Sequence, residues 1–160
     1  MKNRRLLAPL LLLAALSLTT GACKEIRKWL PATEVRQAEK GTPEALVMEA
    51  LRAGQVCQKD GIEAGWAILR PILHSDLTSM RSSEESFYSM NFPAYCRKVN
   101  LMLPEDGTLW YKLDYWDSES KNEERDRRLF VVTRGSDMPA PFRINRDPKA
   151  DGAWRVKNVP

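Results

Sequence analysis

The sequence predicts an α+β fold in which N-terminal helices pack on one face of a four-stranded antiparallel sheet. Two observations predict it. Between residues 42 and 103, apolar residues recur at three- and four-residue spacing, which is typical of amphipathic helices. From residue 108 onward, apolar and polar residues alternate in short segments separated by turn residues, which is typical of strands. Because the helices precede the strands instead of alternating with them, an α+β arrangement is favoured.

The first helix is expected to begin at Thr42 and to end near Gly61. Thr42 is a good N-cap, Pro43 suits the first helical position, and the carboxylate of Glu44 meets the positive end of the helix dipole. Apolar residues then recur on one side of the segment up to Cys57. These signals predict a long, capped helix that opens the folded domain.

Two further helical segments are expected before the strands. The second runs from residue 62 to about residue 74, and Pro71 breaks or kinks it. The third begins after Ser83 with two glutamates in its first turn, is interrupted at Pro93 and resumes over residues 94–103.

The strands follow a turn at residues 104–107, which reads Pro-Glu-Asp-Gly. A polar loop at residues 117–126 and a second glycine-containing turn at residues 148–152 separate later segments. Four strands are predicted: residues 108–116, 128–133, 142–145 and 153–159.

The first 22 residues have the pattern of a secretory signal. Lys2, Arg4 and Arg5 precede a run of thirteen mostly apolar residues, and small residues follow it. The apolar run is too short to cross a bilayer, which takes about 20 residues.

The four residues 20–23, Thr-Gly-Ala-Cys, resemble a bacterial lipobox. The resemblance implies cleavage before Cys23 and a diacylglycerol, with an acyl chain such as palmitate, on that residue. Several acyl chains hold a protein firmly at a membrane. Since Lys24 stands where an aspartate marks inner-membrane retention, the resemblance implies a cell-envelope protein at the outer membrane, facing the periplasm. The alternative is an ordinary secretory signal cut at Ala22.

The domain organisation follows from these signals: a signal peptide over residues 1–22, a lipidated cysteine with a flexible tether over residues 23–41, and one α+β domain over residues 42–160. The signal holds three of the 25 Lys+Arg residues and none of the 21 Asp+Glu residues, so the remaining chain has 22 basic against 21 acidic side chains. A net charge of about +1 does not indicate a nucleic-acid partner.

Cys57 and Cys96 remain once Cys23 is assigned to lipid. An even pair outside the cytoplasm indicates a disulfide. Two buried free thiols are the alternative.

Four residues are candidates for a site. His74 is the single histidine and could act as a general base, although a histidine at a helix end is the simpler reading. Asp114 is the best carboxylate on a strand if its face turns inward, and a solvated strand face is the alternative. Trp110 and Trp116 share one face of the first strand by alternation and could form a binding surface, whereas core packing is the alternative use of such rings. No metal or cofactor is expected, because ligand-spaced His/Cys clusters and phosphate loops are missing from the sequence.

The long capped first helix, the helical segment ending at residues 73–74 and a last strand containing Trp154-Arg155-Val156 resemble the NTF2-like (cystatin-like cone) superfamily. The resemblance implies a cone-shaped pocket between sheet and helices. The expected function is binding or scaffolding at the membrane, with an envelope protein or a small apolar ligand as partner. A small-molecule-binding or enzymatic domain using the cone, and a subunit of a larger envelope complex, are the alternatives.

Overall fold

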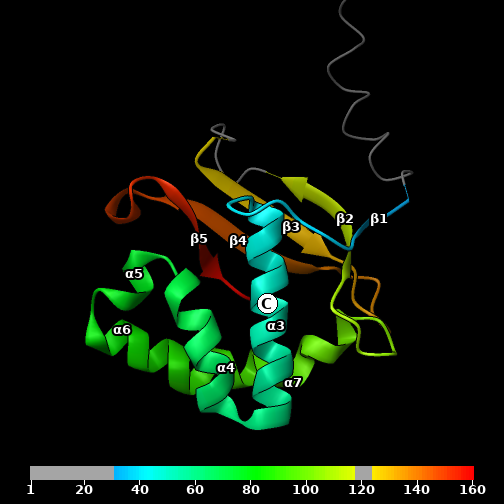
Figure 1. Cartoon of the computed structure of the whole chain (residues 1–160), viewed down its shortest axis with the longest axis horizontal. Coiled ribbons are helices and arrows are strands. Elements are labelled where there is room, and N and C mark those ends of the chain that lie inside the picture. Colours follow the sequence, from blue (N-terminus) through cyan, green and yellow to red (C-terminus); the bar gives the residue numbers. More distant parts are fainter. Residues whose placement is uncertain (1–30, 118–123) are drawn as a thin grey trace, which may run out of the picture. The chain divides into compact units, whose positions relative to one another are not determined.

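The structure is a computed structural model that describes residues 31–117 and 124–160 (Figure 1). Cys23, the signal segment and the first part of the predicted tether lie outside the described residues. Residues 32–160 form one compact unit.

The first long helix confirms the prediction made from its capping residues. Helix α3 spans Pro43–Asp60, and the hydroxyl of Thr42 accepts a hydrogen bond from the N–H of Ala45 at 3.3 Å. The helix ends at Gly61, whose φ of 98° lies in a region that suits glycine and lets the chain reverse directly into the next helix.

The remaining helices are short and follow one another closely. Pro71 lies in the 3₁₀ turn that ends the second helical segment, as expected. Pro93 does not interrupt the third segment: a π-helical turn before it absorbs the missing N–H donor, and the helix continues. The elements are α4 (Ile62–Leu69), η2 (Arg70–Ile72), α5 (Ser75–Thr78), α6 (Arg81–Ser86), η3 (Phe87–Asn91), α7 (Phe92–Lys98) and η4 (Val99–Leu101).

Among the described residues, the sheet is an open antiparallel meander of five strands in sequence order, which corrects the expected number of four. The additional strand lies at residues 33–35, inside the segment predicted to be a flexible tether, and pairs with the first predicted strand. Three residues are too few to show alternation, which is why the pattern did not predict it. The elements are β1 (Thr33–Val35), β2 (Tyr111–Asp117), β3 (Asp126–Val131), β4 (Ala140–Asp147), the 3₁₀ turn η5 (Pro148–Ala150) and β5 (Ala153–Asn158).

The core lies between the helices and the inner face of the sheet, and aromatic side chains fill it. In Figure 1, the helices lie on one side of the sheet and α3 extends up to it. Tyr95 from α7 packs edge-on against Phe142 from β4, with ring centroids 6.1 Å apart. Both rings are fully buried, as are Phe92 and Tyr111. These rings fill the space between the helices and the sheet, where a pocket was expected.

The predicted disulfide is confirmed. Cys57 of α3 and Cys96 of α7 are bonded, with their Cα atoms 6.0 Å apart and 39 residues between them in sequence. The side-chain amide of Gln58 donates to the carbonyl of Cys96 at 2.6 Å beside it. The bond therefore joins α3 to α7 across the helical layer.

Within residues 31–117 and 124–160, no helix combines the length and hydropathy needed to cross a bilayer.

Candidate functional site

Two arginines occupy inward positions at one end of the sheet. On β3, Leu129 points into the core, and the inward position two residues earlier is Arg127. On β4, Ile144 points into the core, and the inward position two residues later is Arg146. Inward positions of central strands normally carry apolar residues. The change from apolar residues to arginine marks the point where the core ends.

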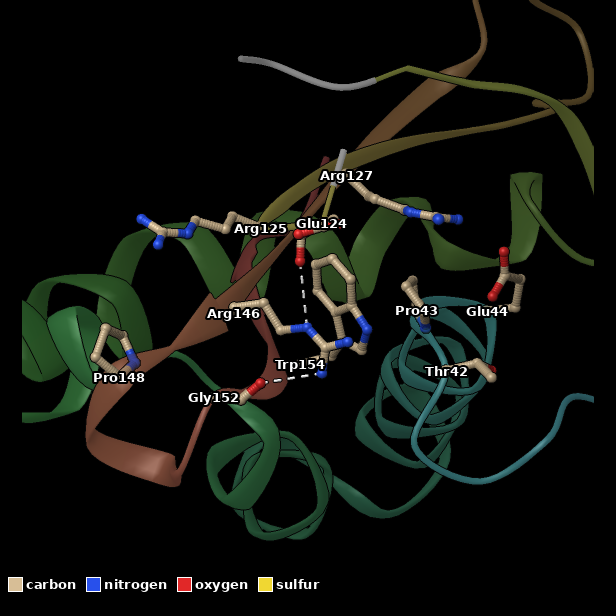
Figure 2. Close-up of a pocket in the computed structure, with 10 residues that line it drawn as sticks. All are labelled: Thr42, Pro43, Glu44, Glu124, Arg125, Arg127, Arg146, Pro148, Gly152 and Trp154. Atoms are coloured by element: carbon tan, nitrogen blue, oxygen red, sulfur yellow. Dashed lines mark hydrogen bonds between the residues drawn. The ribbon is translucent and has the colours of Figure 1, made fainter. Parts of the chain in front are cut away.

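A cleft of about 940 Å³ lies at this point (Figure 2). It extends from the inner face of the sheet to the N-terminus of α3, and the turn between β4 and β5 lines it as well. Ten residues line the cleft: Thr42, Pro43, Glu44, Glu124, Arg125, Arg127, Arg146, Pro148, Gly152 and Trp154.

Arg146 is held in place by three contacts. Its Nε donates to the carbonyl of Glu124 at 3.3 Å, and its Nη1 donates to the carbonyl of Gly152 at 3.0 Å. Its guanidinium lies over the ring of Trp154, 4.2 Å from the centroid. Because a guanidinium has five N–H donors, these contacts fix its plane and leave donors that can reach a ligand.

Arg127 lies near the same ring, with its Cζ atom 6.0 Å from the centroid of Trp154. Trp154 itself is only 8% exposed, so it acts as a support for the two guanidinium groups. Figure 2 shows the guanidinium of Arg125 directed away from this group. Arg127, Arg146 and Trp154 are called the arginine–tryptophan cluster below.

The turn that supports Arg146 depends on Asp147, a carboxylate that is 2% exposed. Its Oδ1 accepts from the N–H of Lys149 at 2.9 Å and from the hydroxyl of Ser75 at 2.8 Å, and its Oδ2 accepts from the N–H of Ser75 at 2.7 Å. The N–H of Gly152 donates to the carbonyl of Asp147 at 2.9 Å and closes the turn. Asp147 therefore ties the turn to the start of α5.

Two opposed effects act on the pKa of Asp147. Burial raises it, but the hydrogen bonds from Ser75 and Lys149 and the nearby His74 more than offset the burial, so the pKa of the carboxyl lies below its usual range. A lowered carboxyl pKa adds stability above the pKa of the unfolded chain, about 4, and this contribution is lost as the pH falls through the folded-state pKa.

Asp147→Asn is expected to lower the free energy of unfolding by about 1 kcal/mol at neutral pH, because charge-assisted hydrogen bonds become neutral ones. It should also make the loss of stability below about pH 4 less steep. Melting temperatures measured across the acid range test both effects. Asp137→Asn, which removes a carboxylate from an exposed loop, is the control and should follow the parent profile; identical profiles for both variants would contradict the role given to Asp147.

The cleft can bind an anion. Its lining carries three arginines and two glutamates, a net charge of about +1. Arginine presents its donors in a planar fork that matches carboxylate and phosphate oxygens. Among the described residues, no group of three or more His, Cys, Asp or Glu side chains is placed to hold a metal ion.

The structure places His74 away from this cleft lining and buries it, with 6% of its surface exposed. Its Nδ1 accepts from the N–H of Asp76 at 3.2 Å, so it caps the short helix α5. The hydroxyl of the adjacent Ser75 donates to Asp147, which leaves its proton unavailable to the imidazole. These contacts give His74 a structural role at a helix end.

The other three sequence candidates lie on or beside β2. Asp114 is exposed on the strand. Trp110 precedes the strand, half-buried, with the guanidinium of Arg36 4.4 Å from its ring centroid. The side chain of Trp116 lies outside the described part of the chain. A register shift between Leu113 and Tyr115 interrupts the alternation on which a shared Trp110 and Trp116 face was predicted.

The sequence analysis missed the arginine–tryptophan cluster because two of its predicted strands were too short. The predicted strands at residues 128–133 and 142–145 stopped just short of Arg127 and Arg146. The available signal was the continued alternation, Arg127 before Leu129 and Arg146 after Ile144. Arg127 and Arg146 lie where the cleft begins.

Fold and site together define an α+β domain with an open, arginine-lined cleft at one end of its sheet. No protein-family model matches the sequence, and neither the curated proteins nor the solved structures searched contain a match to it.

Proposed function

We propose that this chain is a lipid-anchored protein of the cell envelope that binds an anionic ligand in the cleft of the arginine–tryptophan cluster. The observation that carries the binding role is the placement of Arg127 and Arg146 at inward positions of two central strands, where a sequence selected only for stability would carry apolar residues. The Trp154 ring and two backbone carbonyls hold Arg146 in a fixed orientation before any ligand arrives, which lowers the entropic cost of binding.

The envelope location is supported by two independent features. The lipobox-like segment ending at Cys23 provides the anchor, and the disulfide between Cys57 and Cys96 suits an oxidising compartment. An anchor at Cys23 leaves nine residues before the first strand at Thr33. At no more than about 3.5 Å per residue, this segment would keep the domain within about 32 Å of the membrane. We place it at the outer membrane on the basis of Lys24.

An NTF2-like relationship is part of the proposal, supported by helices that pack on one face of an antiparallel sheet. In this chain, the position of the cone would be filled by Tyr95, Phe92 and Phe142, so the proposed ligand binds at the end of the sheet. Asp114 is exposed and His74 is buried in a helix cap, and this arrangement does not favour the alternative of an enzyme that uses these two residues within the cone.

Cys23→Ala is expected to abolish incorporation of labelled palmitate and to release the protein from the membrane fraction, because the substitution removes the thiol that would carry the diacylglycerol. The measurement is fractionation of cells expressing the parent chain and the variant. Cys57→Ala with Cys96→Ala is the matched control, since it removes two cysteines and keeps Cys23. Unchanged membrane association of the Cys23 variant would overturn the anchor.

A further inference from the structure

The chemistry of the arginine–tryptophan cluster indicates which class of anion the cleft binds. This inference rests on the proposed function. Both positively charged inward positions carry arginine, and neither carries lysine. Arginine binds tetrahedral and planar oxyanions through paired donors, whereas lysine acts as a single point charge. The cluster therefore selects for the geometry of an oxyanion as well as for its charge.

The orientation of Arg146 separates its donors into two groups. Nε and one Nη1 hydrogen are used by the carbonyls of Glu124 and Gly152. Within the described residues, the Nη2 group makes no hydrogen bond to protein, so its two N–H donors can serve a ligand. These donors lie in the guanidinium plane, which the contact with the Trp154 ring holds in place, so their directions are set before a ligand binds.

Arg127 provides the second guanidinium from the neighbouring strand. It lies near the same indole ring, at 6.0 Å compared with 4.2 Å for Arg146. A carboxylate has two oxygens in one plane, and a single guanidinium edge satisfies both. A phosphate group has its oxygens arranged in three dimensions and can accept from two guanidinium groups on different oxygens.

The charge of the cleft also favours a phosphate group over a carboxylate. Glu44 and Glu124 also line it and repel anions, so a weakly charged anion would gain little. A phosphate monoester carries a charge of about −1.5 to −2 at neutral pH, and it interacts more strongly with the paired guanidinium groups than a single carboxylate does.

We infer that the arginine–tryptophan cluster binds the phosphate group of a phosphate ester. Two sources share the phosphate geometry: a soluble phosphate monoester, which also carries the higher charge, and the singly charged phosphodiester headgroup of an anionic phospholipid near the anchor. The cleft, about 940 Å³ in volume, accommodates either a lipid headgroup or a small ester.

The test uses the full chain as exported by cells and purified in a neutral detergent. The readout is the indole N–H signal of Trp154 in two-dimensional NMR spectra, one of five tryptophan signals, assigned with Trp154→Phe. The probes are inorganic phosphate, glycerol 3-phosphate, short-chain phosphatidylglycerol with short-chain phosphatidylcholine as its control, and succinate. Sodium chloride at matched ionic strength accounts for nonspecific screening.

A saturable shift of the Trp154 signal with a phosphate-bearing probe is expected in the parent chain. The double variant Arg127→Gln with Arg146→Gln should weaken binding about 10- to 100-fold, the usual effect of losing charge-assisted hydrogen bonds. Arg97→Gln removes one positive charge from an exposed position on α7 and should bind like the parent. Arg146→Lys keeps the charge but loses the fork, and should bind with intermediate affinity.

The probes separate the outcomes. Binding of glycerol 3-phosphate identifies a soluble ester, with inorganic phosphate showing that the phosphate group itself is recognised. Binding of phosphatidylglycerol alone identifies a headgroup. Arginine-dependent binding of succinate without binding of any phosphate would overturn this inference and leave anion binding as the proposed function. Equal affinity of the Arg97→Gln variant and the double variant for the probes, or no shift of the Trp154 signal with any anion, would overturn both the inference and the proposed function. A well-dispersed amide spectrum of the double variant shows that it is folded.

Discussion

Removal of the disulfide between Cys57 and Cys96 is expected to lower the free energy of unfolding by about 4 kcal/mol. The bond closes a loop of 39 residues, and the chain-entropy relation gives about 4 kcal/mol for a loop of that length. The loop contains α4, α5, α6 and the π-helical turn, which are short helices with little stability of their own. Urea-induced unfolding of the parent chain with and without reductant measures the difference.

The control for the reductant is the double variant Cys57→Ala with Cys96→Ala. Its unfolding midpoint should be the same with and without reductant and should lie close to that of the reduced parent. A difference below about 1 kcal/mol between the oxidised and reduced parent would show that the unfolded loop is already restricted by other contacts, contrary to the chain-entropy account.

Gly65→Ala is expected to have the second largest effect on stability, a loss of about 2 kcal/mol. A Cβ atom at this position would lie 2.5 Å from the carbonyl oxygen of Ala53 and 2.5 Å from the Cβ of Cys57. Since backbone atoms of α3 form part of the obstacle, α4 must move away from α3, and overpacking of this kind costs about 1–3 kcal/mol. Alanine regains up to about 1 kcal/mol through its higher helix propensity, which offsets only part of the cost.

Gly54→Ala is the matched comparison, because it also replaces a glycine in a helix. Its Cβ would meet side-chain atoms, at 2.8 Å from Cγ2 of Val99 and 3.1 Å from Cε1 of Tyr95. Side chains can adjust more readily than backbone, so the loss of stability should be smaller than at Gly65. Thermal unfolding of both variants checks the order; an equal or larger loss at Gly54 would show that the contact between α3 and α4 is not the tighter of the two.

Local signals predicted the helical part of the fold well. Thr42 and Pro43 placed the start of α3 correctly, and Gly61 placed its end, because capping depends on neighbouring residues alone. The cysteine pair was also predictable, since Cys57 and Cys96 remain once Cys23 is assigned to the proposed anchor, and an even pair outside the cytoplasm indicates a disulfide. In both cases the deciding interaction is encoded by residue type and spacing.

The errors share another cause. The bulge between Leu113 and Tyr115 changes which side chains share a face, and as a result Tyr115, 39% exposed, stacks on Phe130 with ring centroids 4.2 Å apart. A bulge depends on the neighbouring strand, and periodicity within one strand does not report it. The three-residue strand β1 likewise exists because β2 provides its partners.

The sequence by itself determined the order of the helices and of the four strands that follow them, the caps of α3, the pairing of Cys57 with Cys96 and the expectation of a lipid anchor at Cys23. Only the tertiary structure decided where a ligand could bind. Arg127 and Arg146 lie 19 residues apart in sequence and converge on Trp154 because three antiparallel strands bring their inward positions together. Convergence of this kind depends on strand register, which is set by contacts between distant segments and not by any local pattern.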